Sequence, residues 1–167
     1  MAKLTIRPAT ADDIATMAEL KSTYVRSLYR GFISQDILHR STPDFHAATL
    51  RAWLESGMYR ILLAECDGIL SHYIVFGTNP EEPHNGLIYE GVSSSFTSTE
   101  GKRLLVDCCL QELREMGHTI AHLWILTDNF RLRFLFENLG FRPDGAQEKR
   151  NMFGQELHIA RYQYKLK

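Results

Sequence analysis

Residues 122–141 read HLWILTDNFRLRFLFENLGF, and this stretch decides the fold. Its apolar run at 123–126 predicts a buried strand, and the polar residues at 127–129 end that strand. Leucine and phenylalanine then recur on one helical face up to Leu139. Gly140 and Phe141 follow, and a glycine after the last periodic residue is typical of a helix end. We therefore expect a strand, a tight turn at Asn129 and a helix that ends at Gly140.

The bulk composition restricts the class of protein before any motif is considered. The chain has 167 residues, which is about one domain, and 44% of them are hydrophobic. Its start, MAKLTIRPAT, is too polar for a signal peptide, and no apolar run reaches the roughly 20 residues that cross a membrane. Three cysteines fit neither a disulfide framework nor a metal-site spacing, and a net charge of −1 argues against nucleic acid as a partner. We expect a cytoplasmic protein that binds neither membrane nor nucleic acid.

The N-terminal third alternates one strand with helical segments. The strand is expected to end at Arg7-Pro8, because proline cannot donate to a sheet ladder. Thr10 and Asp13 then suit a helix start, as a capping hydroxyl and an acidic residue in the first turn. Apolar residues at helical spacing predict helices at 14–20, at 24–38 with a break near Gly31, and at 43–55.

The rest of the chain predicts a meander followed by a strand–helix–strand crossover. Asp67-Gly68 is the strongest hairpin signal, and Gly91 inside a strand predicts a bulge or a close backbone approach. The expected elements are strands at 61–66, 69–76 and 87–92, a loop at 93–100, a long helix ending at Gly117, a strand at 120–126, a helix at 128–138 and a strand at 157–166. This order predicts one α/β domain over residues 1–167 with a mixed sheet.

The junction at 98–102 is the first candidate binding site. A helix N-terminus offers unpaired backbone amides and a positive dipole end, which together suit a phosphate. Ser98, Thr99 and Gly101 lie at this junction, and Lys102 adds a positive charge. The alternative is that Thr99 only caps the helix.

These motifs resemble the GNAT superfamily of N-acetyltransferases over nearly the whole chain. The resemblance is carried by Gly101 and the helix that follows, the strand through Trp124, Asn129, and Gly140-Phe141. It implies a mostly antiparallel central sheet that is splayed in the middle and flanked by helices. It also implies acetyl-CoA as acyl donor, bound between the strand ending near Val92 and the strand through Trp124, with the pyrophosphate over the amides before Gly101. Asn129 either contacts this cofactor or caps the next helix.

Two departures from the family pattern bear on activity. The phosphate loop of the family is rich in glycine, whereas Thr99 and Glu100 here bring a side chain and a negative charge near the phosphates. Phe136 occupies the position of the frequent tyrosine proton donor, and phenylalanine cannot donate a proton. Water, Tyr73 or Tyr89 could substitute for it.

Two residues are candidates for the catalytic base. Glu90 lies on the strand next to the expected cofactor site, where the resemblance implies a carboxylate that deprotonates the acceptor amine; the alternative is a solvent-facing glutamate. His72, inside an apolar strand, is the second candidate and is more typical of a structural histidine. His118 and His122 are four residues apart, but a strand over 118–122 would separate them by about 13 Å, so we expect no shared metal.

The sequence therefore predicts an enzyme that moves an acetyl group from acetyl-CoA to an amine of a small molecule or peptide. The resemblance adds a homodimer as an expected assembly. A module that binds an acyl-CoA for regulation, with little or no catalysis, is the alternative, and a longer acyl donor is a third possibility.

Overall fold

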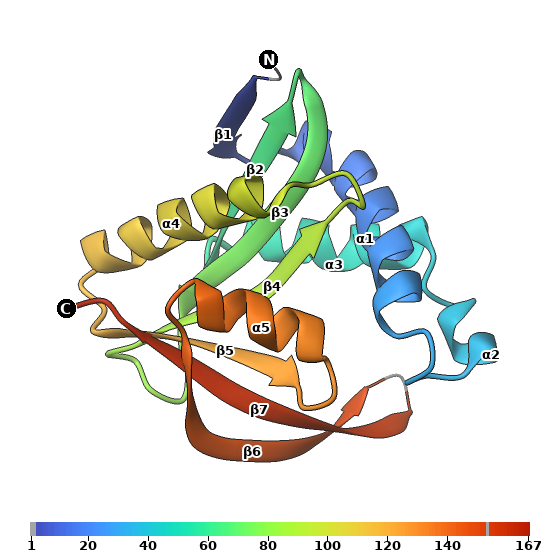
Figure 1. Cartoon of the computed structure of the whole chain (residues 1–167). Coiled ribbons are helices and arrows are strands. Elements are labelled where there is room, and N and C mark those ends of the chain that lie inside the picture. Colours follow the sequence, from blue (N-terminus) through green and yellow to red (C-terminus); the bar gives the residue numbers. More distant parts are fainter. Residues whose placement is uncertain (1–2, 153) are drawn as a thin grey trace. The chain divides into compact units, whose positions relative to one another are not determined.

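The computed structural model describes residues 3–152 and 154–167 (Figure 1). These residues form two compact units. The first comprises the chain up to Phe76 together with Glu90–Cys109, and the second comprises Gly77–Tyr89 and Leu110–Lys167. The strands form a seven-stranded sheet in the order β1-β2-β3-β4-β5-β7-β6. This mixed, mostly antiparallel sheet with its helices confirms the predicted α/β class. In the part of the chain that is described, no helix is long and apolar enough to span a membrane.

The first unit begins with the predicted strand, β1 (Leu4–Pro8), which pairs antiparallel with β2 (Tyr59–Cys66) from Leu4↔Cys66 to Pro8↔Leu62. A 3-10 turn, Ala11–Asp13, leads into α1 (Ile14–Leu28), and α2 (Gln35–Leu38) and α3 (Pro43–Ser56) follow. The two helices expected at 14–20 and 24–38 were wrong in their bounds. Helix α1 continues across the expected gap at 21–23 and ends at Leu28, and the predicted break near Gly31 is confirmed, since Gly31 adopts φ +90° before α2 begins at Gln35.

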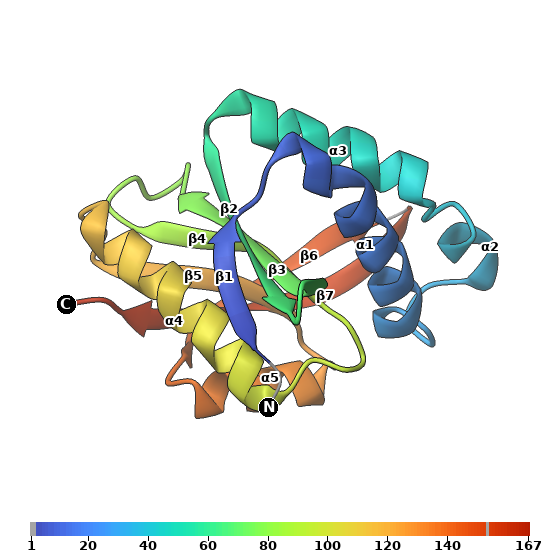
Figure 2. The same ribbon diagram turned by 90° about the horizontal axis from the view of Figure 1, so that it is seen from above.

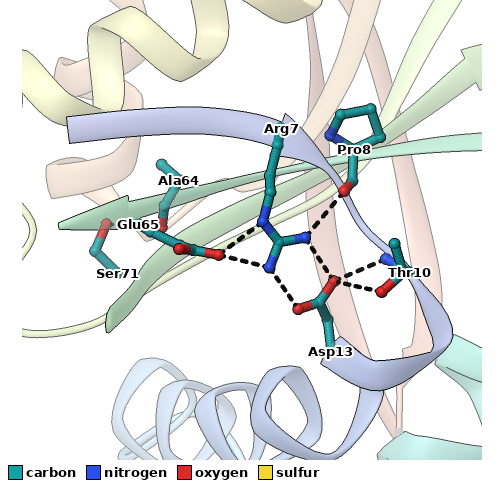
Figure 3. A network of polar contacts seen from close by, with 7 residues as sticks. All are labelled: Arg7, Pro8, Thr10, Asp13, Ala64, Glu65 and Ser71. Carbon is teal, nitrogen blue, oxygen red and sulfur yellow. Dashed lines mark hydrogen bonds and ion pairs between the residues drawn. The ribbon is translucent and has the colours of Figure 1, made fainter. Parts of the chain in front are cut away.

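A polar network at the start of α1 connects it to the strands (Figure 3). Arg7 of β1 contacts Glu65 of β2 through Nε at 2.7 Å and Asp13 through both terminal nitrogens at 2.7 and 2.9 Å. The Asp13 carboxylate also accepts from the Thr10 amide at 2.7 Å, as the predicted helix start requires. The Arg7 guanidinium lowers the pKa of Asp13 to about 2. The network therefore holds the first turn of α1 against β1 and β2.

The predicted hairpin is confirmed in the same unit. β2 ends at Cys66 and β3 (Ile69–Thr78) begins after Asp67 and Gly68, which adopt φ 52° and φ 80°. Positive φ at both central residues is the signature of the tight hairpin turn that Asp-Gly favours. Helices α1 and α3 lie side by side in both views (Figures 1 and 2), and their inner residues Met17, Ala18 and Leu50 are buried.

The second unit contains the crossover that residues 122–141 predict. β5 (Ile120–Leu126) pairs in parallel with β4 (Gly86–Ser93) over Gly86↔Ala121 to Ile88↔Leu123, and α5 (Phe130–Asn138) follows it. Helix α4 (Thr99–Glu115) precedes β5 and contributes residues to both units. At the end of α5, Gly140 adopts φ +101°, and a Cβ there would meet the Tyr164 ring at 3.0 Å. Glycine is therefore required by both backbone conformation and space.

One strand is missing from the sequence-based prediction. β6 (Arg142–Met152) pairs antiparallel with β7 (Gln155–Lys165), and β7 in turn pairs with β5 from Ile120↔Lys165 to Leu126↔Ile159. β6 is almost entirely exposed, so it lacks the alternation of apolar residues by which a strand is recognised. The splay expected beside β4 stays a prediction.

Candidate active site

Glu90 on β4 is held by two partners in the first unit. Lys21 Nζ lies 2.8 Å from Oε1 of Glu90, and the Tyr73 hydroxyl donates to Oε2 at 3.0 Å. The side chain of Glu90 is 18% exposed. Glu90 is therefore not the solvent-facing glutamate of the alternative interpretation. It is a carboxylate whose position is fixed from α1 and from β3.

Lys21 is the residue of this cluster that the sequence analysis missed. Its side chain is only 11% exposed, and its ammonium lies 5.1 Å from the centre of the Trp53 ring on α3, a distance typical of a cation–π contact. A signal for it was present, because Lys21 continues the buried face of α1 at four residues after Met17 and seven after Ile14. A lysine on the apolar face of an amphipathic helix needs a partner, and here that partner is Glu90.

Two tyrosines complete the surroundings of Glu90. Burial, and then the negative charge of Glu90, raise the pKa of Tyr73 well above its usual range. The same causes raise the pKa of Tyr24, on α1, to about 12. Both phenols therefore stay neutral at physiological pH. The cluster presents one cation, one anion and two neutral hydroxyl groups.

Beyond Glu90, Val92 is a buried residue of β4. The whole residue is 2% exposed, so neither its side chain nor its main chain presents a free surface. A Cβ on Gly91 would meet no atom within 4 Å, so the expected close approach of another backbone to Gly91 is not found in the described part of the chain. The strand ends at Ser93, and the amide of Ser94 donates to the carbonyl of Ser71 on β3 at 2.8 Å.

The start of α4 is capped by Ser98 rather than by Thr99. Ser98 Oγ accepts from the Gly101 amide at 3.0 Å, and its carbonyl accepts from the Lys102 amide at 3.0 Å. The Gly101 amide is thus already bonded within the protein. Thr99 and Glu100 are exposed, and their amides lie in the first turn, where a helix contains no carbonyl to accept from them. These two amides fit an anion, whereas the side chain of Glu100 opposes one.

His72 supports this helix start and does not face an open site. It is buried, with Nδ1 2.7 Å from Ser71 Oγ and Nε2 2.8 Å from the Gly101 carbonyl oxygen. Burial lowers the pKa of His72, the Gly101 carbonyl opposes this shift, and the charge of Lys102 adds to it. A Cβ on Gly101 would lie 3.2 Å from Ser98 Oγ and 3.6 Å from His72 Cε1. Both ring nitrogens are engaged, which favours the structural interpretation of His72.

The remaining predicted residues belong to the second unit. Asn129 caps α5, since its side-chain oxygen accepts from the Leu132 amide at 3.1 Å. Phe136 is buried and packs edge-on against Phe141, with ring centres 5.2 Å apart. Tyr89, one of the two candidate donors, donates to the Thr78 carbonyl at 2.9 Å.

The two histidines with metal-like spacing contact different partners in the same unit. His118 Nε2 lies 3.2 Å from Thr78 Oγ1, whereas His122 Nδ1 lies 3.2 Å from the side chains of Asn79 and Glu82. Arg161 joins the second group through an ion pair with Glu82 at 3.0 Å. Burial and then Arg161 lower the pKa of His122, so the ring is neutral at pH 7. Each histidine is thus part of a hydrogen-bonded side-chain group.

Comparisons with known proteins agree with this architecture. No family model and no curated protein matches the sequence. Among solved structures, an N-acetyltransferase from Staphylococcus aureus Mu50 aligns with a TM-score of 0.73 and 18% identity over 99% of both chains. An acetyltransferase of the GNAT family from Streptococcus pneumoniae aligns with a TM-score of 0.68 and 18% identity over 98% of this chain and 99% of that one. The PaiA N-acetyltransferase from Thermoplasma acidophilum, in complex with coenzyme A, aligns with a TM-score of 0.69 and 12% identity over the same shares. The chain is similar in fold to GNAT acetyltransferases, which confirms the expected fold.

Proposed function

We propose that this chain is an acyl-CoA-dependent N-acyltransferase, with residues 1–167 as one acyltransferase domain, that transfers an acetyl group from acetyl-CoA to an amine. The observation that carries the proposal is the environment of Glu90. A carboxylate fixed by Lys21 and Tyr73 lies on β4, and an exposed helix N-terminus follows it in the same unit of a GNAT-like fold. The coenzyme A bound to the Thermoplasma protein supports the choice of donor.

The pyrophosphate of the donor would lie at the segment that contains Ser98, Thr99, Gly101 and Lys102. Ser98 holds the Gly101 amide there, and the amides of Thr99 and Glu100 would bind the anion. The exposed first-turn amides of α4 supply hydrogen bonds and the positive end of the helix dipole. The positive charge of Lys102 is offset by the negative charge of the exposed Glu100, so we expect the pyrophosphate to bind more weakly than it would to a glycine-rich loop. Asn129 is proposed to order the start of α5, and its cap to Leu132 supports that role.

Glu90 is proposed as the base for the acceptor amine. A carboxylate has about four lone-pair positions, and Lys21 and Tyr73 use only one on each oxygen. The bound donor supplies an acetyl thioester whose carbonyl the amine attacks. Glu90 takes a proton from the ammonium form of the acceptor and so leaves a neutral amine for this attack, and the backbone amide near Val92 stabilises the charge on the carbonyl oxygen.

Calorimetry and a turnover assay test this proposal. Titration of the pure protein with acetyl-CoA and with CoA is expected to show saturable binding, and CoA release is expected with at least one amine from a broad panel of small molecules and peptides. Absence of binding at millimolar ligand contradicts the proposal. Competition between acetyl-CoA and longer acyl-CoAs reports the preferred chain length.

A regulatory module that binds acyl-CoA without turning it over is the second candidate. Two features favour it: Phe136 has no hydroxyl to donate, and Thr99 and Glu100 depart from the usual phosphate loop. Saturable binding together with no CoA release across the amine panel supports this candidate. Release with any amine excludes it.

A further inference from the structure

The ion pair between Lys21 and Glu90 is an unusual way to surround a catalytic base. Its atoms lie 2.8 Å apart, and its side chains are 11% and 18% exposed. A buried ion pair is weak evidence for stability, because removing two charges from water offsets most of their attraction. A lysine beside the base also opposes the approach of a second ammonium group. The pair therefore suggests a role in recognising the acceptor.

The charges around the pair favour an acceptor that is itself electrically balanced. Tyr73 and Tyr24 stay neutral because their pKa values are raised. His46, on α3, is also neutral, since burial and then the nearby charges of Lys21 and Arg26 lower its pKa to about 4. Lys21 and Glu90 cancel each other. An amine with a single positive charge could use a remaining lone-pair position of Glu90, but its ammonium would then lie beside the Lys21 ammonium with no second negative charge to balance it.

We propose that the acceptor is a free α-amino acid, whose ammonium group binds Glu90 and whose carboxylate binds Lys21. This inference rests on the proposed function. An α-amino acid carries opposite charges separated by a single carbon atom, so it can exchange partners with an ion pair and leave no charge unpaired. Tyr73 keeps its hydrogen bond to Oε2, which holds Glu90 in place while Lys21 turns to the ligand.

The reaction balances with these groups alone. The α-ammonium loses a proton to Glu90 and becomes a neutral amine, which attacks the thioester carbonyl. A C–N bond forms, the C–S bond breaks, and CoA leaves with the sulfur electron pair. The second amine proton and the proton on Glu90 pass to the thiolate and to water. The products are the N-acetyl amino acid, CoA and one proton.

The test compares the rate of acetylation of each amino acid with that of its α-amide, which lacks the negative charge of the carboxylate. CoA release is measured with acetyl-CoA and each of the twenty protein L-amino acids, and with the α-amide of each. The best acid is expected to exceed its amide in kcat/KM by about tenfold or more, as a lost charge-assisted hydrogen bond would give. Equal or faster turnover of the amide, or no turnover of any acid, overturns the inference.

Three variants separate recognition from a purely structural role. Lys21→Gln is expected to remove the preference for the acid mainly through its KM, and Lys21→Arg to restore most of it. Lys149→Gln, at an exposed lysine on β6, is the matched control and is expected to keep the preference. If Lys21→Gln lowers acid and amide by the same factor, Lys21 serves only to hold α1 and the inference fails.

The same data distinguish this failure from failure of the proposed function. Saturable binding of acetyl-CoA with turnover of simple amines but not of amino acids overturns the amino-acid inference alone. No binding of acetyl-CoA contradicts both. Circular dichroism and thermal melting of each variant establish that it is folded before its kinetics are compared.

Discussion

Acid is expected to destabilise this protein through His46. His46 is 2% exposed, and its Nε2 lies 2.6 Å from Ser41 Oγ. Burial and then the charges of Lys21 and Arg26 lower its pKa to about 4, against an ordinary value of 6.5. The folded protein therefore binds this proton less readily than the unfolded chain does. The stability that neutral His46 gives is fully present above pH 6.5 and is lost as the pH falls toward 4.

The magnitude follows from the difference between the two pKa values. One pH unit corresponds to about 1.4 kcal/mol, so the whole shift is worth about 3 kcal/mol in the free energy of unfolding. About 2 kcal/mol of this is expected to be lost by pH 5. His46→Gln keeps an amide near Ser41 but cannot titrate. Its free energy of unfolding should fall less between pH 7.5 and 5 than that of the wild type, by about 2 kcal/mol.

Urea unfolding followed by circular dichroism at a series of pH values measures this difference. Burial also lowers the pKa of His122, so the pH dependence of the wild-type free energy of unfolding includes the titration of a second histidine. The comparison with His46→Gln isolates the contribution of His46. Ser41→Ala is the control, since it removes the hydrogen-bond partner but keeps the titrating ring, and it should retain the acid loss. Parallel curves for the wild type and His46→Gln would refute the reasoning.

Three further substitutions test other parts of the structure. Glu90→Gln removes the proposed base and should lower kcat/KM by about 10² to 10⁴. An unchanged rate would mean that water, and not Glu90, accepts the proton of the amine. Gly101→Ala places a Cβ 3.2 Å from Ser98 Oγ, so we expect a disturbed cap on α4 and weaker CoA binding by calorimetry, and unaltered binding would locate the phosphates elsewhere. Asp13→Asn breaks the pair with the partly exposed Arg7, so it should lower the free energy of unfolding at pH 7. This deficit in urea unfolding should shrink as wild-type Asp13 is protonated near pH 2, and a deficit that does not change with pH would contradict the role of the charge.

Local signals predicted most of the fold, and the exceptions have a common cause. Asp67-Gly68, the cap at Thr10 and Gly140 each act through backbone conformation or adjacent hydrogen bonds, so a short window of sequence contains the whole cause. β6 forms for a different reason. It is exposed and is defined by its ladder with β7, from Arg142↔Gln163 to Met152↔Gln155, which no pattern within its own residues encodes. Strands that depend on a partner are not visible in their own periodicity.

The sequence predicted the candidate site residues that belong to one strand or to one helix start. It did not predict the contact between residues of two different elements. Glu90 and Gly101 could be identified from position along the chain. Lys21 could not be assigned to Glu90, because α1 and β4 are about seventy residues apart in sequence and only the fold brings their side chains to 2.8 Å. The cap considered at Thr99 lies one residue too late, since serine and threonine are both favoured at N-caps and the hydrogen bond to Ser98 Oγ identifies the residue that caps the helix.

The chemistry of the leaving group explains why Phe136 is compatible with the proposed reaction. Tyr73 cannot easily replace a missing donor, because its pKa lies well above that of an ordinary phenol and its hydroxyl already donates a hydrogen bond to Glu90. A thiol resembling cysteine has a pKa near 8.5, about 1.5 units below that of free tyrosine, so a thiolate leaves more readily than it would recover a proton from Tyr73. In the proposed reaction the buried tyrosine holds Glu90 for the amine. The proton transfer that this reaction requires is the one that leaves the acceptor, and we propose that Glu90, Lys21 and Tyr73 control it.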